Sequence, residues 1–344
     1  MIYSSIFYDQ ARNCRDLGSP FMGKLMTLFG DKIAQGSDVF DPLARLVNDP
    51  DVFSGNFPLR LAGALHGFVL ENPDCALAKA YPPAQWEQDL IWAGLGETIA
   101  QNADWIARWV MVPPQTNEIR RSSVIAAAAR GIFDRYQLPL MVSEIGASVG
   151  LNLNFDRYQV AAKGFDFTPR DPILTLTPDW RGGPVRTGDI PVVDRAGVDS
   201  APLDAHDPRD ALKLRAYTWP DQIDRLERLD AALPHQKTQI ERGDAVPWLA
   251  RRINAQPESA VHFIYHTVVR QYFDPASEKE FQSALDMAAS RATQQRPVAH
   301  FSMEYDGAVD SAGLRLSIWP EGIRCDLGRA DFHGRWVAWT GIDC

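Results

Sequence analysis

Residues 139–152 constrain the fold of this chain more than any other segment. An apolar run from Leu140 to Val142 is typical of a buried strand, and the strand ends in an acid, Glu144. A turn of small residues follows at 146–150, where two glycines allow a tight reversal and let a ligand approach main-chain N–H groups. The segment therefore predicts the first strand of an α/β sheet, with a small polar ligand at its carboxyl end.

The same turn also spells G-x-S-x-G, the nucleophile elbow of serine hydrolases, with Ser148 as the nucleophile. An α/β-hydrolase places several strands and an oxyanion loop before that elbow, whereas the sequence before residue 138 has helical periodicity and no such loop. The dinucleotide fingerprint G-x-G-x-x-G is absent as well, because Ser148 occupies its central glycine position. The hydrolase therefore stays a third alternative, and NAD or FAD is disfavoured.

Two regions differ in their hydrophobic pattern. Residues 1–137 repeat apolar positions at spacings of three and four, which predicts a helical N-terminal cap domain. Residues 138–344 alternate short apolar strands with helical segments, which predicts a parallel sheet covered by helices. The segment at about 159–190 is rich in Gly, Pro, Asp and Thr and is interpreted as an insertion.

The boundaries of the elements in the second region follow from the same pattern. Strands are predicted at 139–145, 192–198, 238–242, 260–266, 297–303, 313–319 and 334–340. Helices are predicted at about 148–157, 207–216, 219–232, 245–253 and 277–292. The last two predicted strands follow each other without a helix, so a closing antiparallel pair is expected. The fold class expected from this pattern is a doubly wound, mostly parallel α/β sheet preceded by an all-helical domain.

Composition limits the classes of partner. The net charge is −9 and no cluster of basic residues is longer than a pair, which argues against nucleic acid. No apolar stretch approaches the roughly 20 residues that span a bilayer, and the N-terminus lacks the pattern of a signal peptide. Four scattered cysteines predict isolated thiols and no metal site. We therefore expect a cytoplasmic protein that acts on a small molecule, with no membrane partner and with its oligomeric state open.

Acids end three successive predicted strands, an order that an S-adenosylmethionine pocket requires. Glu144 would lie near the methionine amino group, Asp199 would accept from the ribose hydroxyls, and Asp244 would accept from the adenine amino group. The alternative is that Asp199 and Asp244 cap the helices that follow them. The predicted cofactor-binding residues are Glu144, Gly146, Ala147, Ser148, Gly150, Asn152, Asp199, Asp244 and Ala245.

The fourth predicted strand ends at His266, the usual position for chemistry in this fold. An imidazole with a reference pKa near 6.5 can remove a proton from a nucleophile at neutral pH, so His266 is the candidate catalytic base. The alternative is a hydrogen-bonded structural histidine.

With these residues in view, the chain resembles an uncharacterised bacterial family, the domain of unknown function 2332 family, over nearly its whole length. The resemblance is carried by Gln115-Thr-Asn-Glu118 with Arg121-Ser122, Glu144 to Tyr158, Gly197 to Asp204, Trp219-Pro-Asp221 with Arg225, Gly243-Asp-Ala245, His266 to Tyr272, and Trp319-Pro320. The chain departs mildly at Val149, where the family more often has alanine, and at Thr267, where it often has serine. The resemblance implies a sheet similar to that of class I methyltransferases with an added helical front, and it brings no established reaction.

The resemblance also draws attention to the polar segment that follows Pro113-Pro114. One interpretation is that this segment caps the next helix. The other is a lid over the carboxyl edge of the sheet, which contacts the cofactor or the substrate. The predicted substrate or lid residues are Gln115, Thr116, Asn117, Glu118, Arg121, Gln271 and Tyr272.

The function predicted from the sequence is a methyltransferase that uses S-adenosylmethionine on a small molecule. The alternative is a non-catalytic module of the same fold that binds S-adenosylmethionine or a nucleotide. One observation favours the non-catalytic module: the Asn/Asp-Pro-Pro-Tyr motif of amino-methylating enzymes is missing from the end of the fourth predicted strand.

Overall fold

The computed structural model describes residues 4–46, 52, 56–308 and 310–342. Its internal contacts divide the chain into two compact units. The first unit contains Met1–Thr116 and Asp207–Leu229, and the second contains Asn117–His206 and Asp230–Cys344. This division differs from the predicted boundary at 137/138 in two ways: residues 117–137 belong to the second unit, and the helical segment 207–229 belongs to the first.

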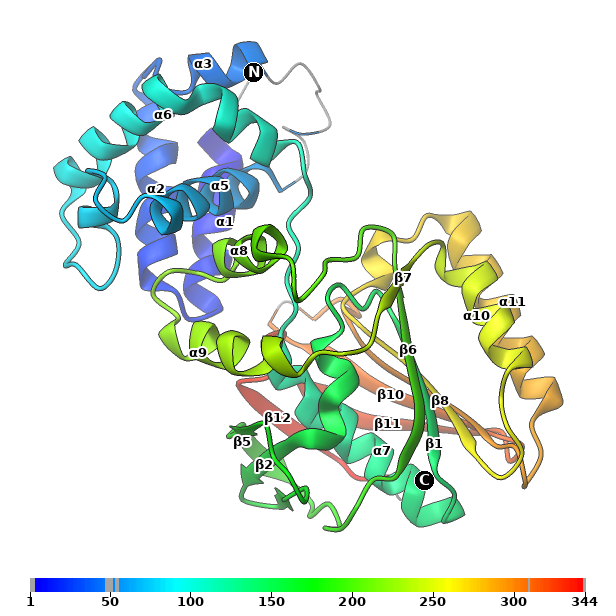
Figure 1. Cartoon of the computed structure of the whole chain (residues 1–344). Coiled ribbons are helices and arrows are strands. Elements are labelled where there is room, and N and C mark those ends of the chain that lie inside the picture. Colours follow the sequence, from blue (N-terminus) through cyan, green and yellow to red (C-terminus); the bar gives the residue numbers. More distant parts are fainter. Residues whose placement is uncertain (1–3, 47–51, 53–55, 309, 343–344) are drawn as a thin grey trace. The chain divides into compact units, whose positions relative to one another are not determined.

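The first unit is helical throughout its described residues (Figure 1, blue to cyan and light green). Its elements are α1 (Ser4–Asp16), α2 (Pro20–Ala34), α3 (Asp41–Leu46), α5 (Phe57–Glu71), η1 (Ala78–Ala80), α6 (Gln88–Val110), α8 (Pro208–Tyr217) and the first part of α9 (Ile223–Ala232). Phe7 makes edge contacts with Phe29 and Phe57 and stacks on Phe40, so four aromatic rings form the centre of this core. The predicted helical N-terminal region is confirmed.

Close packing of α5 against α8 explains why a later segment joins this unit. A Cβ at Gly63 would overlap with the ring of Tyr217, so a glycine is needed where the two helices meet. One turn along α5, His66 Nδ1 lies 3.1 Å from the carbonyl oxygen of Ala216. The hydrophobic pattern alone gives no information on this long-range partnership, since it reports a buried face without naming what covers it.

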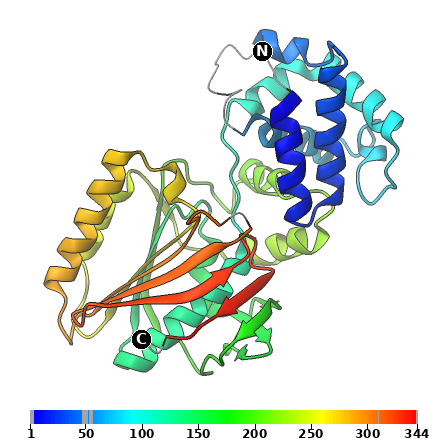
Figure 2. The ribbon, with the colours of Figure 1, turned by 180° about the vertical axis from the view of Figure 1, so that it is seen from behind.

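The second unit is built on a nine-stranded sheet with the order β5-β12-β11-β10-β9-β8-β1-β6-β7. The strands are β1 (Leu140–Ile145), β5 (Asp179–Gly182), β6 (Val192–Asp199), β7 (Ile240–Arg242), β8 (Val261–Thr267), β9 (Val298–Glu304), β10 (Ala312–Trp319), β11 (Ile323–Ala330) and β12 (Trp336–Trp339). Strands β7, β6, β1, β8 and β9 are parallel, whereas β9 to β12 form an antiparallel series whose orange and red strands lie side by side in Figure 2. A mixed α/β fold with a large, mostly parallel sheet is therefore confirmed.

Helices cover both faces of the parallel part of the sheet. Helix α7 (Ser122–Tyr136) contacts β8 and β9, and α10 (Ala245–Asn254) contacts β1 and β6 from the other side, where α11 (Pro275–Arg291) packs on it (Figure 1). Strand β1 lies between β6 and β8, so the order of the strands reverses at this point. In open α/β sheets, ligands bind outside the carboxyl ends of the strands next to such a reversal.

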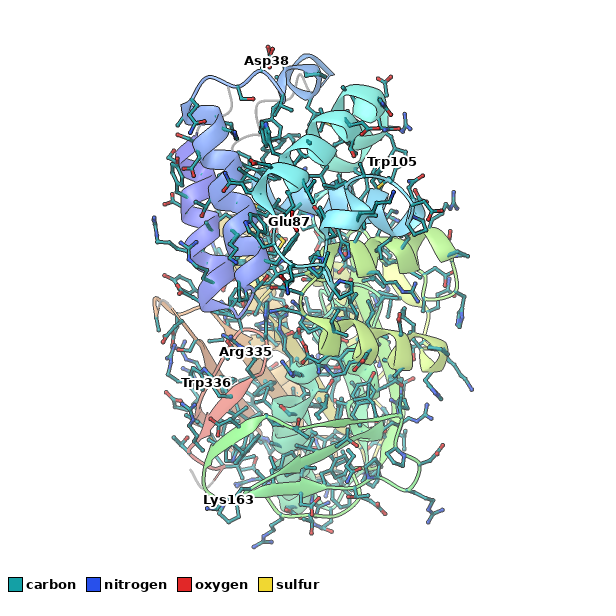
Figure 3. All side chains as sticks on the ribbon, turned by 90° about the vertical axis from the view of Figure 1, so that its left-hand side faces the viewer. Asp38, Glu87, Trp105, Lys163, Arg335 and Trp336 are labelled. Atoms are coloured by element: carbon teal, nitrogen blue, oxygen red, sulfur yellow. The ribbon has the colours of Figure 1, made fainter. Side chains whose placement is uncertain are left out.

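Several elements were not predicted. Strand β11 was not predicted, although Ile323, Cys325 and Leu327 alternate with polar residues, as is typical of a half-buried strand. The insertion contains a small sheet of β2 (Tyr158–Ala162), β3 (Phe165–Phe167) and β4 (Leu174–Leu176). Strand β5 then pairs with β12, which carries Trp336 (labelled in Figure 3). The Arg181 guanidinium of β5 lies 5.3 Å from the centre of the Trp336 ring. The helix predicted at 148–157 is the 3-10 segment η3 (Leu151–Arg157).

The cysteines differ from the prediction of isolated thiols. Cys14 and Cys75 are not disulfide-bonded, whereas Cys325 is, and Cys344 lies outside the described residues. Cysteine usage therefore no longer supports the expectation of a cytoplasmic protein. None of the described helices has both the length and the apolarity that a bilayer-spanning segment needs.

A buried histidine makes the stability of the second unit sensitive to acid. His262 on β8 is fully buried with Nε2 2.9 Å from Ser143 Oγ, and burial, helped by the charge of Arg252, lowers its pKa to about 3. The unfolded chain protonates this residue near pH 6.5 and the folded chain does not, so stability falls as the pH drops below 6.5. The loss that this residue causes between pH 6.5 and 4.5 is about 2.3 kcal/mol.

Urea unfolding at several pH values checks this expectation. We expect His262→Gln, whose amide can still bond to Ser143, to flatten the fall in stability between pH 6.5 and 4.5. His235→Gln removes an exposed histidine and serves as the control, which should keep the wild-type slope. An unchanged slope in His262→Gln would show that another group carries the acid sensitivity.

Candidate functional site

The turn after β1 is tied to the end of β6. The N–H groups of Gly146 and Ala147 both donate to the carbonyl oxygen of Val198, and Ser148 N donates to Asp199 Oδ2 at 2.8 Å. Gly146, Ser148 and Gly150 have φ values of 69°, 54° and 82°. The backbone is therefore left-handed at three positions of one short turn, and only two of these are glycine.

Protein side chains fill the space beside the two glycines. A Cβ at Gly146 would overlap with Val269, and one at Gly150 would overlap with Gln236 and Ile240. Gln236 Nε2 also donates to Val149 O at 2.7 Å. In this structure the glycines thus make room for the chain's own packing rather than for an open approach to a ligand.

Glu144 lies in the core of the unit, below η3, and only 2% of its surface is exposed. The hydroxyl oxygen of Tyr265 lies 3.4 Å from Glu144 Oε2 and 3.0 Å from the carbonyl oxygen of Asn152. Burial raises the pKa of Glu144 well above its usual range, the charge of Asp199 adds to this, and Tyr265 and Arg121 oppose it. A neutral carboxyl group sealed by Tyr265 is not placed to bind a methionine amino group.

Asp199 and Asp244 lie at the carboxyl ends of the neighbouring strands β6 and β7. Besides the bond from Ser148, Asp199 accepts from Ala201 N at 2.9 Å through Oδ1. Asp244 accepts from Val246 N at 2.8 Å through Oδ1, so it caps α10, and Ala245 is the first residue of that helix. Between the two acids, a Cβ at Gly243 would meet only Val198 Cγ2, at 3.9 Å. The backbone between the two carboxylates is therefore open.

The boundary between the two units falls within the predicted lid segment, after Thr116. Asn117 Oδ1 accepts from Leu151 N at 2.7 Å and Glu118 accepts from Arg120 N at 3.1 Å, so both hold the backbone of the second unit. Arg121 donates to the carbonyl oxygens of Phe332 and Thr267 at 2.9 and 3.2 Å. Gln115 and Thr116 are the last two residues of the N-terminal segment that belongs to the first unit.

Two further predicted residues complete this edge. Asn152 Oδ1 accepts from Ser122 Oγ at 2.7 Å and is buried. Tyr272, in η5 (Arg270–Tyr272), is 70% exposed. The first is therefore a structural residue of the core, and the second is available to a ligand.

His266 does not reach the surface of the site. Its side chain is fully buried, Nδ1 lies 2.6 Å from Glu304 Oε1, and Nε2 lies 3.0 Å from Nε2 of His300. The ring of Phe281 on α11 packs edge-on against it at 5.6 Å between centroids. Because its side chain is buried and both ring nitrogens are engaged, His266 is not placed to take a proton from a ligand in this conformation, unlike the base predicted from the sequence.

Glu304 is a candidate site residue that the sequence analysis did not single out. It ends β9 and lines a cavity of about 470 Å³ between η5, the carboxyl end of β9 and the start of β10, whose other lining residues are Arg270, Gln271, Ser302, Tyr305, Asp306, Gly313 and Arg315. Burial alone would raise the pKa of Glu304, yet hydrogen bonds from His266 and from the N–H groups of Val269 and Arg270 lower it overall. Asp199 was predicted as a site residue because it is an acid at the end of a strand, and Glu304 has the same position at the end of β9. The same sequence signal could therefore have identified Glu304.

The loop between β8 and this cavity is held in a strained conformation. Val268 has a φ of 57°, which a β-branched residue rarely adopts. Val268 N donates to Met303 O at 2.8 Å and Val269 N donates to Glu304 Oε1 at 3.0 Å. Ser148 and Val268 thus place left-handed residues after both β1 and β8, the strands that flank the reversal of strand order. Strain of this kind is concentrated at functional sites.

Comparisons with known proteins give one match. A family model described as an uncharacterized protein conserved in bacteria (DUF2332) matches residues 4–339. Searches of curated proteins and of solved structures gave no match.

Proposed function

The chain belongs to the bacterial DUF2332 family, and we propose that it is an S-adenosylmethionine-dependent methyltransferase acting on a small molecule. The observation that carries the proposal is the pair of carboxylates at the ends of β6 and β7, beside the point where the strand order reverses next to β1. This edge is where an open α/β sheet binds a nucleotide-like ligand.

The adenosine half of the cofactor fits these residues. A carboxylate offers about four acceptor positions, and the hydrogen bonds described above leave some of them available on Asp199 and Asp244. Asp199 would accept from the ribose hydroxyls and Asp244 from the adenine amino group. The open backbone at Gly243 lets a flat ring lie between them.

The methionine half does not fit the predicted residues in this conformation. Tyr265 and η3 seal Glu144, and Val269 occupies the space beside Gly146. When bound, the cofactor supplies an electrophilic methyl group, and the chain's own contribution is to hold the adenosine at the ends of β6 and β7. The proposal therefore includes no residue that contacts the methionine part of the cofactor.

A second candidate is the non-catalytic module that binds S-adenosylmethionine or a nucleotide. The closed space beside Gly146 favours it, because a module that recognises adenosine needs no access for a methionine end. The serine hydrolase receives no such support. Both nitrogens of His266 are engaged by Glu304 and His300, and β1 is the first strand within the described residues, so the strands that precede an elbow are missing there.

Calorimetric titration with S-adenosylmethionine and S-adenosylhomocysteine tests the proposal. We expect Asp244→Ala to weaken binding of both about tenfold or more, because a hydrogen bond to a charged group is lost. Asp207→Ala is a matched control, since Asp207 caps α8 in the same way and either change costs about 1 kcal/mol of stability.

Three outcomes of these experiments bear on the proposal. Absence of heat at about 1 mM of either ligand, a concentration that detects even weak complexes, would refute the proposal. Binding that Asp244→Ala and Asp207→Ala weaken equally would remove Asp244 from the site. Binding without methyl transfer to any small-molecule acceptor would favour the non-catalytic module.

A further inference from the structure

We infer that the cavity between η5, the carboxyl end of β9 and the start of β10 binds a small zwitterion with an apolar or aromatic side chain. Glu304 holds its ammonium group and Arg315 holds its anionic group. This inference goes beyond the cofactor proposal, because none of the residues assigned to the cofactor lines this cavity. Its volume of about 470 Å³ falls within the range of small-molecule sites.

The ammonium end is recognised by a fixed carboxylate. His266 Nδ1 and Val269 N both bond to Oε1 of Glu304, at 2.6 and 3.0 Å, and the side chain is 14% exposed where it lines the cavity. These bonds, together with one from the Arg270 N–H, keep the carboxylate oriented, and a carboxylate with about four acceptor positions can accept a further bond from a ligand. A charge-assisted bond to such a group is about twice as strong as a neutral one.

The anionic end is recognised by an arginine whose charge is only loosely compensated. Arg329 donates to both oxygens of Asp306, at 2.8 and 2.9 Å, whereas Arg315 lies 3.6 Å from the same carboxylate. Two guanidinium groups therefore share one acid, and Arg315 is 65% exposed at the cavity wall. Arg270, the other arginine of the cavity, is paired with Glu278.

Two tyrosines stand beside the charged groups. Tyr305 lines the cavity and is 56% exposed, and Tyr272, next to the cavity residue Gln271, is 70% exposed. Exposed aromatic rings beside a polar cavity offer a surface for a flat or apolar side chain. The arrangement therefore fits a ligand with two opposite charges and an apolar body, as in an aromatic amino acid.

His266 is a positioning residue in this site. It touches no ligand, but its Nδ1–H sets the orientation of the Glu304 carboxylate, and the neighbouring His300 fixes the other end of the ring. Burial, together with the charges of His266 and Arg270, lowers the pKa of His300 well below its usual value, so His300 stays neutral. His300 therefore fixes the ring of His266 without carrying a positive charge of its own.

Titration calorimetry with three probes tests the inference without the cofactor. The probes are phenylalanine, phenethylamine, which lacks the carboxylate, and 3-phenylpropanoate, which lacks the ammonium group. We expect phenylalanine to bind the full-length chain about tenfold or more tightly than either analogue, because each analogue loses one charge-assisted bond. Equal affinities, or no binding of any probe at about 10 mM, would overturn the inference.

Variants assign each end of the ligand. Glu304→Gln should abolish the preference for phenylalanine over 3-phenylpropanoate, and Arg315→Gln should abolish the preference over phenethylamine. Arg324→Gln changes an exposed arginine on the neighbouring strand β11 and should keep both preferences. Preferences that survive in Glu304→Gln and Arg315→Gln would contradict the assignment. A failed titration with S-adenosylmethionine leaves this result untouched, so the two proposals fail separately.

The role of His266 has its own readout. Asn in place of His266 keeps a donor near the position of Nδ1, whereas Phe keeps only the shape of the ring. We expect His266→Phe to lose the preference for phenylalanine over 3-phenylpropanoate and His266→Asn to retain part of it. Equal preferences in both variants would show that the ring serves packing alone.

Discussion

Gly146→Ala is expected to lower the free energy of unfolding of the second unit by about 2–5 kcal/mol. A left-handed φ of 69° costs an alanine about 1–2 kcal/mol. The new Cβ also overlaps with Val269, and overpacking of this kind costs a further 1–3 kcal/mol or so. Urea unfolding followed by circular dichroism measures the difference.

Gly322→Ala separates the two contributions to this loss. Gly322 has a φ of 71°, nearly that of Gly146, but nothing lies within 4 Å of the position of its Cβ. We expect only the backbone contribution of about 1–2 kcal/mol from this control. Trimming Val269 to alanine in the Gly146→Ala background should recover part of the remainder. Equal losses at the two glycines would mean that the turn after β1 is open, as a ligand cradle requires.

Glu144→Gln is expected to stabilise the protein at pH 8. Burial raises the pKa of Glu144 well above its usual value, because the low-dielectric surroundings disfavour the ionised carboxylate. The unfolded chain releases this proton near pH 4.5 and the folded chain holds it, so stability is lost as the pH rises from 4.5 toward the folded pKa. Glutamine keeps the shape of the side chain, and its amide oxygen still accepts from Tyr265.

The pH dependence distinguishes a sealed acid from a ligand-binding acid. The stabilisation by Glu144→Gln should be small at pH 4.5 and grow toward pH 8, as measured by thermal and urea unfolding. Glu241→Gln, the same change at an exposed acid on β7, should show no such trend. If Glu144→Gln instead destabilised the protein at pH 8, the Glu144 carboxylate would be ionised in the folded chain, as a ligand-binding acid requires.

Much of the fold was predictable because burial leaves a periodic trace in the sequence. The strand from Leu140 to Ile145 and the helix from Ala245 to Asn254 follow from local patterns of this kind. The insertion was harder, because β2, β3 and β4 are short and their pairing depends on residues that are distant in the sequence. The assignment of α8 to the first unit depends on Gly63 and Tyr217, a contact that no local pattern reports.

The sequence predicted which residues lie at the ends of the strands, but it did not predict which side chains they contact. Asp199 and Asp244 end their strands as expected, because parallel strands bring their carboxyl ends to one edge. The environment of His266 depends on the register between β8 and β9, which places it opposite Ser302 and within reach of Glu304. The sealing of Glu144 by Tyr265 likewise depends on how β8 and η3 pack against β1.

The central claim is that the carboxylates at the ends of β6 and β7 hold the adenosine half of the cofactor. The most direct measurement is calorimetric titration of the wild-type chain with adenosine, compared with S-adenosylhomocysteine. The account predicts that adenosine binds within about tenfold of S-adenosylhomocysteine, since Asp199 and Asp244 contact only the shared half, and tenfold corresponds to about 1.4 kcal/mol. Binding of S-adenosylhomocysteine without measurable binding of adenosine, or no binding of either, would contradict it.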